Sequence, residues 1–454
     1  MGYSEYIETG NKYIPRIPED WSVKSGRFCF EENKEKNTEL SERLLLQFTY
    51  GTIVRKKNQE IPPADEQIYQ KYTVVKPNDI ILNGLNLNYD FVSQRVGMVR
   101  EKGIITSAYL ALRCHDVLNP AYANYLLKGM DAQKIFHGMG SGVRLTLGYP
   151  EFSRIQFPVP PREEQDQIVR YLDWQISKIN KLIHGYQRQI KLLEERRQTV
   201  IDTVVTKGIR SGRQLKAIQG NWMGEIPEDW KMIPSKRLFI EGKQRKTPDD
   251  KPATASQKYG IILQEDYMRR ENKRIVIATQ GLEDWKHVNP DDFVISLRSF
   301  QGGIERSDIS GCVTWHYIVL LPQAGVVPRY FKWLLKSKSY IKALQGTSEF
   351  IRDGQDLRYS NFVKIDLPLI PDAEQTEIAD YIEKKIGEID ATIPVIEKQI
   401  ELLKEYRTRL ISDVVTGQKD VRGIEIPGYE AEMDNVEDDE ETIEESEQEV
   451  ESDE

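Results

Sequence analysis

Two stretches of the chain place apolar residues at the spacing of a coiled coil. Steps of four and three residues from Leu172 to Val204 meet apolar side chains at every position but one, and the same steps repeat about 210 residues later. The first seam is Leu172, Ile176, Ile179, Ile183, Tyr186, Ile190, Leu193, Arg197, Val200 and Val204, and the second is Ile382, Ile386, Ile389, Ile393, Ile396, Ile400, Leu403, Arg407, Leu410 and Val414. The pattern predicts two long helices with matching seams.

Helix-end signals bound these two segments. Pro161 and Pro371 precede the first turns, and Gly208 and Gly417 stand where C-terminal glycines belong. A helix of this length rises to about 65 Å, the length of roughly 19 base pairs of duplex DNA. Pro394 lies inside the second seam and predicts a kink or a short break, because proline removes an intrahelical hydrogen bond.

The regions before the two helices also repeat. Their matched segments are IPEDW at 17–21 and 226–230, VKPNDIILN at 75–83 and VNPDDFVIS at 288–296, GIITSAYLALR at 103–113 and GCVTWHYIVLL at 311–321, and YANYLLK at 122–128 and YFKWLLK at 330–336. In each copy a turn with Pro and Asp leads into an apolar strand, and a further strand is followed by a helix. The chain is therefore predicted to contain two tandem copies of one mixed α/β module.

The expected fold class is α+β, with two α/β domains in tandem pseudo-repeat separated by two long antiparallel coiled-coil helices. The predicted boundaries are 1–160 for the first domain, 161–208 for the first helix, 209–225 for a linker, 226–370 for the second domain, 371–417 for the second helix, and 418–454 for a C-terminal extension. A homodimeric coiled coil between two chains is the alternative to pairing within one chain.

Charge is distributed unevenly along the sequence. The net charge is −9, but residues 432–454 carry 14 Asp or Glu and no Lys or Arg, which leaves the rest of the chain at +5. An acidic block with few apolar residues predicts a disordered tail, and the segment 418–430 before it is expected near the N-terminal module. A mildly basic body permits nucleic-acid binding without proving it.

The residue types that would mark a metal site, a disulfide framework or an export signal are sparse. The three cysteines form no CxxC pair, and the five histidines show no HxxxH or HxH spacing, so we expect no metal site. The N-terminus has no basic segment followed by an apolar run, and no stretch approaches the length of a membrane span. The expected location is the cytoplasm.

Several linked motifs together resemble one known family, the specificity subunits of type I restriction-modification systems. The motifs are the IPEDW segments, GMGSGVRLTLGYPEF at 138–152, PVPPREEQ at 158–165 and PLIPDAEQ at 368–375, and the endings VVTKG at 204–208 and ISDVVTGQKDVR at 411–422. The resemblance extends to about Tyr429. It implies two target-recognition domains that each read one half of a bipartite, asymmetric DNA sequence, with the helices fixing the gap between the halves.

The resemblance also implies the partners of the chain. These are double-stranded DNA, two methyltransferase subunits and restriction/translocase subunits. S-adenosylmethionine, ATP and Mg are expected in these partner subunits and not in this chain. The sequence itself lacks a GxxxxGK[ST] phosphate loop, a strand-associated GxGxxG and a [DN]PP[YF] methylation motif. We therefore expect no catalytic residues and no cofactor here.

Candidate DNA contacts lie in basic or amide-rich loops that follow predicted strands, because Asn and Gln pair with adenine and Arg with guanine in the major groove. In the first module they are Arg55, Lys56, Lys57, Asn58, Asn83, Asn86, Asn88 and Arg95, and in the second Lys243, Gln244, Arg245, Lys246, Arg298, Ser299 and Gln301. Arg144 and Arg352 follow Gly-rich turns at matching places, where they hold a phosphate or cap local structure.

Other interpretations remain open at this level. The basic loops are also compatible with ordinary solvated loops, and the whole chain with a coiled-coil scaffold that binds no DNA. A fragment of a fused restriction-methylation enzyme is a third interpretation. Salt-dependent retention on DNA separates a DNA reader from a scaffold.

Overall fold

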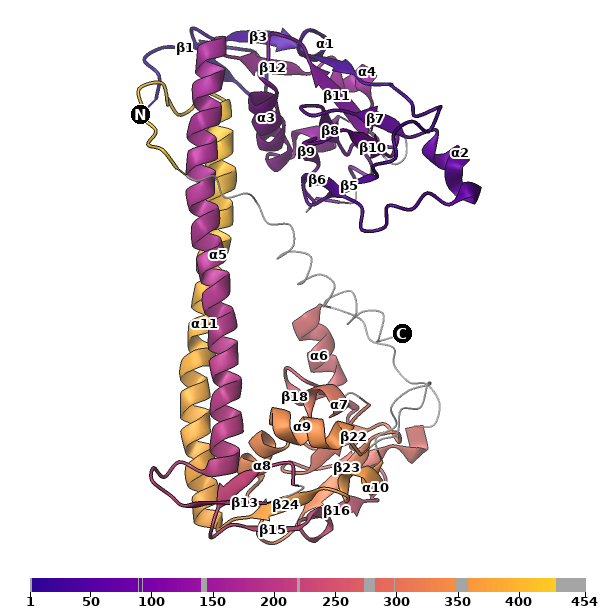
Figure 1. The fold of residues 1–454 in the computed structure, drawn as a ribbon, viewed down its shortest axis with the longest axis vertical. Helices are drawn as coiled ribbons and strands as arrows, with labels where there is room; N and C mark the ends of the chain where they lie inside the picture. Colours follow the sequence, from indigo (N-terminus) through magenta and orange to yellow (C-terminus); the bar gives the residue numbers. More distant parts are fainter. Residues whose placement is uncertain are drawn as a thin grey trace. The chain divides into compact units, whose positions relative to one another are not determined.

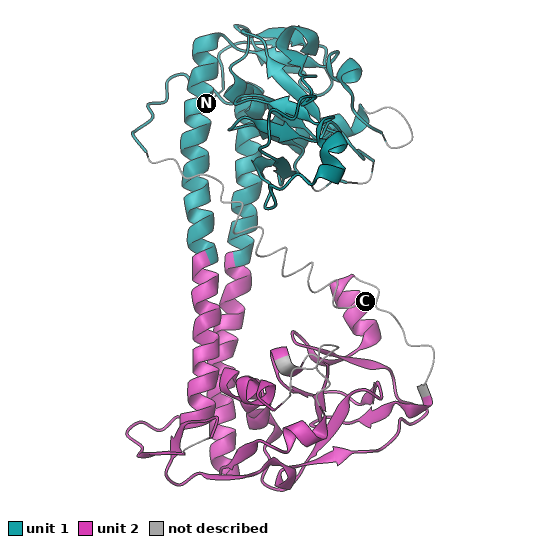
Figure 2. Ribbon diagram, turned by 45° about the vertical axis from the view of Figure 1, so that its right-hand side comes forward, with its two compact units in different colours: residues 1–187, 397–454 teal, residues 188–396 magenta. Residues whose placement is uncertain are grey.

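A computed structural model describes residues 2–88, 90–91, 93–139, 145–218, 221–272, 282–297, 299–347 and 358–429. The chain divides into two compact units (Figure 2). Unit 1 comprises Met1–Gln187 and Glu397–Glu454, and unit 2 comprises Arg188–Ile396. Each unit combines small antiparallel sheets with helices (Figure 1).

Unit 1 is built around a four-stranded sheet of order β4-β11-β8-β9, with bounds Phe30–Glu32, Leu110–Cys114, Ile80–Leu82 and Val96–Met98. Four two-stranded pairs complete it: β1 (Tyr6–Glu8) with β2 (Arg16–Pro18), β3 (Ser22–Ser25) with β12 (Gln156–Val159), β5 (Leu46–Thr49) with β6 (Thr52–Arg55), and β7 (Thr73–Val75) with β10 (Gly103–Ile105). Its shorter helices are α1 (Gly26–Cys29), α2 (Glu66–Tyr69), α3 (Pro120–Ala132) and α4 (Tyr149–Phe152).

Unit 2 has the same arrangement of strands. Its four-stranded sheet has the order β16-β23-β20-β21, with bounds Phe239–Gly242, Ile318–Pro322, Phe293–Ile295 and Glu305–Arg306. The pairs are β13 (Leu215–Ala217) with β14 (Glu225–Pro227), β15 (Lys231–Pro234) with β24 (Asp366–Leu369), β17 (Ala253–Ser256) with β18 (Gly260–Leu263), and β19 (Lys286–Val288) with β22 (Gly311–Val313). Its shorter helices are α6 (Gln264–Glu271), α7 (Ser299–Gly302), α8 (Pro328–Leu334), α9 (Lys338–Gln345) and α10 (Tyr359–Phe362).

The turns with Pro and Asp lead into β8 and β20, as the repeat predicts. Asn78 and Asp291 have φ of 75° and 73°, and each follows a proline. A proline followed by a residue with positive φ is typical of a type II turn. The carboxylates of Asp79 and Asp292 accept hydrogen bonds from the backbone N–H groups of residues 76 and 289, at 3.0 and 2.8 Å. Both turns therefore direct a central strand in the same way.

An aromatic residue occupies the centre of each core. The Phe30 ring is buried edge-on against Phe152 and Phe157, with ring centroids 5.4 and 5.3 Å apart. In unit 2 the buried Phe239 ring makes the same kind of contact with Phe293, Phe331 and Phe362. These rings join the sheet of each unit to its helices.

The predicted long helices are α5 (Arg162–Lys207, 46 residues) and α11 (Asp372–Val415, 44 residues). Every seam side chain is buried or partly buried, whereas Leu192 and Leu402, which lie off the seam, are 57% and 45% exposed. The helix α11 is continuous through Pro394, so the proline does not break it.

Within each unit the local segments of α5 and α11 run antiparallel. In unit 1 Arg407 donates to Asn180 at 2.8 Å, and Gln167 donates to the Val421 carbonyl at 3.1 Å. In unit 2 Arg197 pairs with Asp390 at 3.3 Å. The single arginine of each seam thus bonds to a polar residue of the opposite helix.

One predicted boundary differs from the structure. Residues 209–225, expected as a linker, include β13, which pairs with β14 as β1 pairs with β2. The reason is that Ile226 of the repeated IPEDW segment is a strand residue, fully buried in unit 2, and its strand needs a pairing partner.

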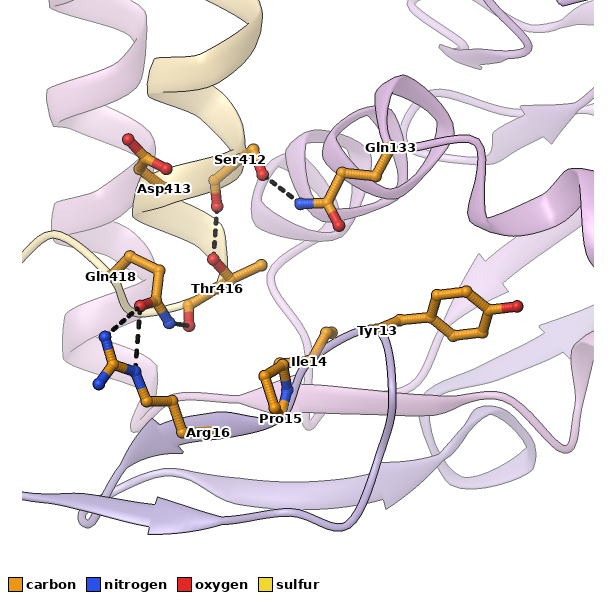
Figure 3. A pocket seen from close by; sticks show the side chains of 9 residues that line it. All are labelled: Tyr13, Ile14, Pro15, Arg16, Gln133, Ser412, Asp413, Thr416 and Gln418. Atoms are coloured by element: carbon orange, nitrogen blue, oxygen red, sulfur yellow. Dashed lines mark hydrogen bonds between the residues drawn. The ribbon is translucent and has the colours of Figure 1, made fainter.

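The segment after α11 closes unit 1. Arg16 donates to Gln418 at 3.3 Å, Arg422 contacts Asp20 at 3.4 Å, and Val421 is fully buried, so this segment lies near the N-terminal module as predicted. A small pocket of about 160 Å³ lies at this junction (Figure 3), with Gln133 and Ser412 hydrogen-bonded on its wall. The acidic residues 432–454 lie outside the described residues.

Candidate nucleic-acid interface

The first basic segment of unit 1 begins at Arg55, the last residue of β6, and continues into the loop after it. Arg55, Lys56, Lys57 and Asn58 are all exposed. The Arg55 guanidinium is already paired with both carboxylate oxygens of Glu101, at 2.8 and 2.5 Å. Lys56 lies exposed beside this ion pair.

A pocket lined by aromatic rings lies beside Lys56. Its volume is about 150 Å³, and the partly buried Phe48, Tyr69, Tyr72 and Tyr109 line it. The Tyr69 and Tyr72 ring centroids are 4.9 Å apart, and those of Phe48 and Tyr109 are 5.7 Å apart. Aromatic faces next to a cation suit the stacking of nucleobases. The candidate list from the sequence missed these residues, although tyrosines three apart next to a basic loop are a readable signal.

The asparagine-rich loop of unit 1 follows β8. Asn83 accepts a hydrogen bond from the Leu85 backbone at 3.1 Å, and Asn86 is exposed with a φ of 52°. Asn88 is partly buried. The tip of the β5–β6 hairpin contacts this loop. Gly51 lies at the tip, and a Cβ added to it would lie only 2.9 Å from the Cβ of Gln94, which belongs to the loop. The structure thus brings the hairpin and the asparagine-rich loop together.

Arg95 does not fit its predicted role as a direct DNA contact. Its side chain is 1% exposed, and its guanidinium donates to the carbonyls of Asn83, Leu85 and Asp90 at 3.1, 2.7 and 2.7 Å. Three carbonyls inside the fold occupy the terminal donors of its guanidinium, so these donors cannot reach DNA. Arg95 organises the loop instead of reaching outward.

The basic loop of unit 2 follows β16. Lys243, Gln244 and Arg245 are exposed and Lys246 is partly buried. Arg245 pairs with Asp284 at 3.1 Å, while backbone hydrogen bonds from Lys246 to Trp285 and from His287 to Gln244 fasten the loop to β19. Further along the loop, the Asp250 carboxylate pairs with the ring of His287 in β19 at 2.8 Å, and both side chains are largely buried.

In the loop after β20, Ser299 also differs from its predicted role as a DNA contact. Ser299 is fully buried and its hydroxyl accepts a hydrogen bond from the Ser296 backbone at 2.9 Å, so it closes a turn and does not face solvent. Gln301, on α7, is exposed. Arg144, Arg298 and Arg352 lie outside the described residues.

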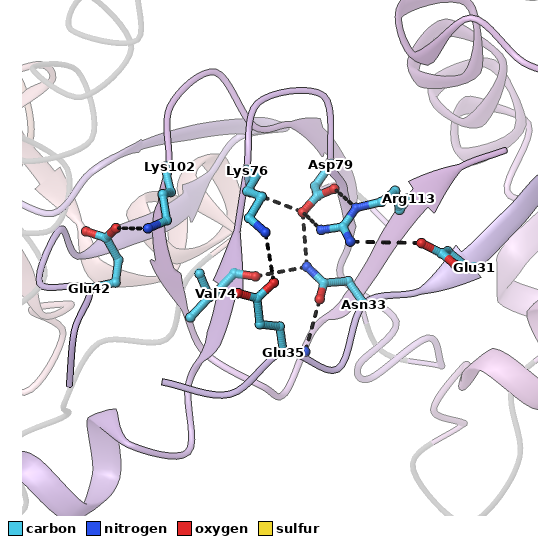
Figure 4. Close-up of polar contacts among 9 residues, drawn as sticks. All are labelled: Glu31, Asn33, Glu35, Glu42, Val74, Lys76, Asp79, Lys102 and Arg113. Atoms are coloured by element: carbon cyan, nitrogen blue, oxygen red, sulfur yellow. Dashed lines mark hydrogen bonds and ion pairs between the residues drawn. The ribbon is translucent and has the colours of Figure 1, made fainter. Parts of the chain in front are cut away.

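The two basic loops do not occupy equivalent positions. Lys243–Lys246 follows β16, whose counterpart is β4, whereas Arg55–Asn58 begins at the last residue of β6, whose counterpart is β18. In unit 1 the position after β4 holds Asn33, which donates to the buried Asp79 at 3.0 Å (Figure 4).

Asp79 is the centre of this polar cluster. It also accepts hydrogen bonds from the Arg113 guanidinium at 3.0 and 3.1 Å, and this pairing raises the pKa of Arg113 (Figure 4). Unit 1 therefore uses Asn33, directly after β4, to hold the turn before β8.

Comparisons with known proteins support one family. No protein-family model matches the chain. Over 228 residues it is 28% identical to the specificity subunit of the type I restriction enzyme MjaVIII of Methanocaldococcus jannaschii, an alignment that covers 49% of this chain and 50% of that protein. Over 310 residues it is 24% identical to the MjaX specificity subunit of the same organism, covering 66% and 68%. The chain is a homologue of type I restriction enzyme specificity subunits.

A solved structure shares the fold of this chain. It is a chain from work on complex assembly and conformational transition of the type I R-M system, with a TM-score of 0.63 and 14% identity over 88% of this chain and 98% of that one. The chain spans half the length of the first relative and about two thirds of the second.

The described residues also bear on the class of site. None of the described helices of this chain is both long and apolar enough to cross a membrane. Among the described residues, His, Cys, Asp and Glu form no group of three or more suited to hold a metal ion.

Proposed function

We propose that the chain is the DNA-reading specificity subunit of a type I restriction-modification complex. Each unit reads one half of an asymmetric, bipartite target in double-stranded DNA. The observation that carries this proposal is that two units of identical strand order present unlike loops at matching positions. Asn83 and Asn86 follow β8, whereas a buried Ser299 and an exposed Gln301 follow β20.

The proposal assigns no catalytic step to this chain. It delivers two methyltransferase subunits and the restriction/translocase subunits to the target in the cytoplasm. S-adenosylmethionine, ATP and Mg belong to those partners. Two methyltransferase subunits are expected because two units of one topology offer two similar docking surfaces.

The helices α5 and α11 act in this proposal as a coiled-coil spacer between tandem recognition domains. A continuous helix of 46 residues rises to about 70 Å, so its length would fix the number of unread base pairs between the half-sites. The matched seams and the cross-helix bonds of Arg197 and Arg407 support a rigid spacer.

Sequencing of DNA methylated in cells tests recognition. The chain is co-expressed with its methyltransferase, and the methylated motif is determined for the natural chain and for one whose residues 22–157 come from another family member. One half of the motif should change and the other should stay. A change in both halves would contradict independent reading, and the absence of any motif would contradict the function itself.

An insertion tests the spacer. Four residues added after Ile190 lengthen the helix by about 6 Å and rotate its far end by about 40°. The motif should acquire a longer gap or be lost. Methylation of the original motif at full rate would exclude the spacer role, and the mass of the purified complex tests whether two methyltransferase subunits bind.

A further inference from the structure

The loops after β8 and β20 end on residues of opposite charge. Arg95 stands directly before β9, and Glu305 is the first residue of β21, the equivalent strand. Both side chains are buried, at 1% and 5% exposure. A buried charge is retained only where partners offset its loss of water, so each of the two positions must be matched to its own surroundings.

Arg95 ties together the loop that precedes it. Its three carbonyl acceptors belong to Asn83, Leu85 and Asp90, so one guanidinium connects the last residue of the loop to its beginning and its middle. The exposed Asn86 lies between these anchors. A planar guanidinium holds several acceptors in fixed directions, which a lysine ammonium cannot reproduce.

Two residues behind the loop support this arrangement. Asp131 of α3 accepts a hydrogen bond from the Arg95 backbone at 2.8 Å, and His137 bonds to the Asp90 carbonyl at 2.9 Å. The Phe91 ring stacks on His137 with centroids 4.7 Å apart. Burial raises the pKa of Asp131, and the bond from Arg95 acts against that rise.

Glu305 fastens the loop of unit 2 in a different way. Its carboxylate pairs with Lys336 at 2.6 Å, and the next residue back, Ile304, donates its backbone N–H to Leu335 at 3.3 Å. Gly303 has a φ of 85°, and a Cβ there would collide with the Leu335 carbonyl. The end of this loop is therefore attached to the segment between α8 and α9, and not to carbonyls of the loop itself.

We propose that Arg95 and Glu305 are positioning residues that determine half-site specificity. Each holds its own loop in the conformation that presents the loop's polar groups to bases, and neither touches DNA. This inference rests on the proposed function. The two residues are not at the same register position, because Glu305 pairs with Val294 and its counterpart in unit 1 is Gly97. Each unit therefore holds its loop with a charge of its own, matched to a different loop conformation.

The test uses Arg95→Lys, Arg95→Met and Glu305→Gln in the full chain, co-expressed with its methyltransferase. The control is Arg154→Met, which removes an exposed arginine of unit 1. The base preference at each position of the methylated motif is read by sequencing. The unaltered half of the motif serves as an internal reference, and thermal unfolding of each purified complex reports stability.

Both Arg95 variants should relax the base preference in the half read by unit 1 and reduce methylation of the original motif about tenfold or more, since hydrogen bonds from a charged donor are lost. Glu305→Gln should relax the other half only, and Arg154→Met should change neither. Arg95→Lys keeps the positive charge, so it still tests the positioning role if Arg95→Met fails to fold.

A purely structural role gives a different result. If the variants lower methylation of the motif while every base preference stays unchanged, or relax both halves alike, the positioning role is wrong and the proposed function stands. If the natural chain directs no methylation to a bipartite motif, the proposed function fails before the variants are compared.

Discussion

Units 1 and 2 share a framework and differ in what they attach to it. The strand orders are the same, the type II turns with Asn78 and Asp291 match, and Phe30 and Phe239 occupy equivalent core positions. In contrast, the single helix α3 of unit 1 corresponds to two helices, α8 and α9, in unit 2. Loop anchoring and surface charge therefore vary while the sheet and its turns stay constant.

The largest effects should follow from removing the central ring of either core. Phe30→Ala and Phe239→Ala each leave a cavity among aromatic rings and should destabilise their own unit by about 3–5 kcal/mol. Hydrogen exchange measured by mass spectrometry should show faster exchange in the altered unit and unchanged exchange in the other. Equal loss of protection in both units would show that they do not fold as separate cores.

The two seam arginines should differ in their contribution to stability. Asn180 is 3% exposed and accepts a hydrogen bond from Arg407, so Asn180→Ala should cost about 1.5–3 kcal/mol. Asp390 is 54% exposed, and Asp390→Ala should cost at most about 1 kcal/mol. Chemical denaturation at low and high salt measures both variants. Added salt should shrink only the Asp390 effect, and a larger loss from Asp390→Ala would reverse this ranking.

The smallest effect concerns the Asp250–His287 pair, which fastens the basic loop of unit 2. Burial acts against the charge of His287, but its hydrogen bonds to Asp250 and Asn289 raise its pKa overall. Burial likewise acts against the charge of Asp250, but hydrogen bonds from Thr247 and His287 lower its pKa. The contribution of His287 is therefore complete below its unfolded pKa and is lost as the pH rises through its folded pKa. The contribution of Asp250 to stability is complete above its unfolded pKa and is lost as the pH falls through its folded pKa.

Exchange of the Lys246 amide, which bonds to Trp285, reports this loop. Raising the pH through the pKa of His287 should accelerate exchange more in the natural chain than in a His287→Gln variant. The variant supplies the intrinsic pH dependence of exchange. Parallel profiles would show that the ion pair does not hold the loop.

Sequence patterns predicted the framework better than the candidate interface. The heptad seams of α5 and α11 and the turns before β8 and β20 depend on local spacing, which a sequence displays directly. Arg95 and Ser299 were assigned outward roles because their residue types suit DNA. Burial decides otherwise, since their partners include the Asp90 carbonyl and the Ser296 backbone. The aromatic pocket was missed because it assembles from β5, α2 and the β10–β11 turn, which are distant in sequence.

The division of the chain has a consequence for its biosynthesis. Unit 2 is one continuous stretch, Arg188–Ile396, whereas unit 1 needs Glu397 and later residues to complete its core, including the buried Leu410 and Val414. At translation rates of about 5–20 residues per second, the early part of unit 1 waits on the order of 10–40 s for that segment. During this interval Ile179 and Ile183 on the nascent α5 lack their final cover. Of the two units, the one that is started first is thus finished last, and until Leu410 and Val414 are made the growing chain exposes this apolar stripe.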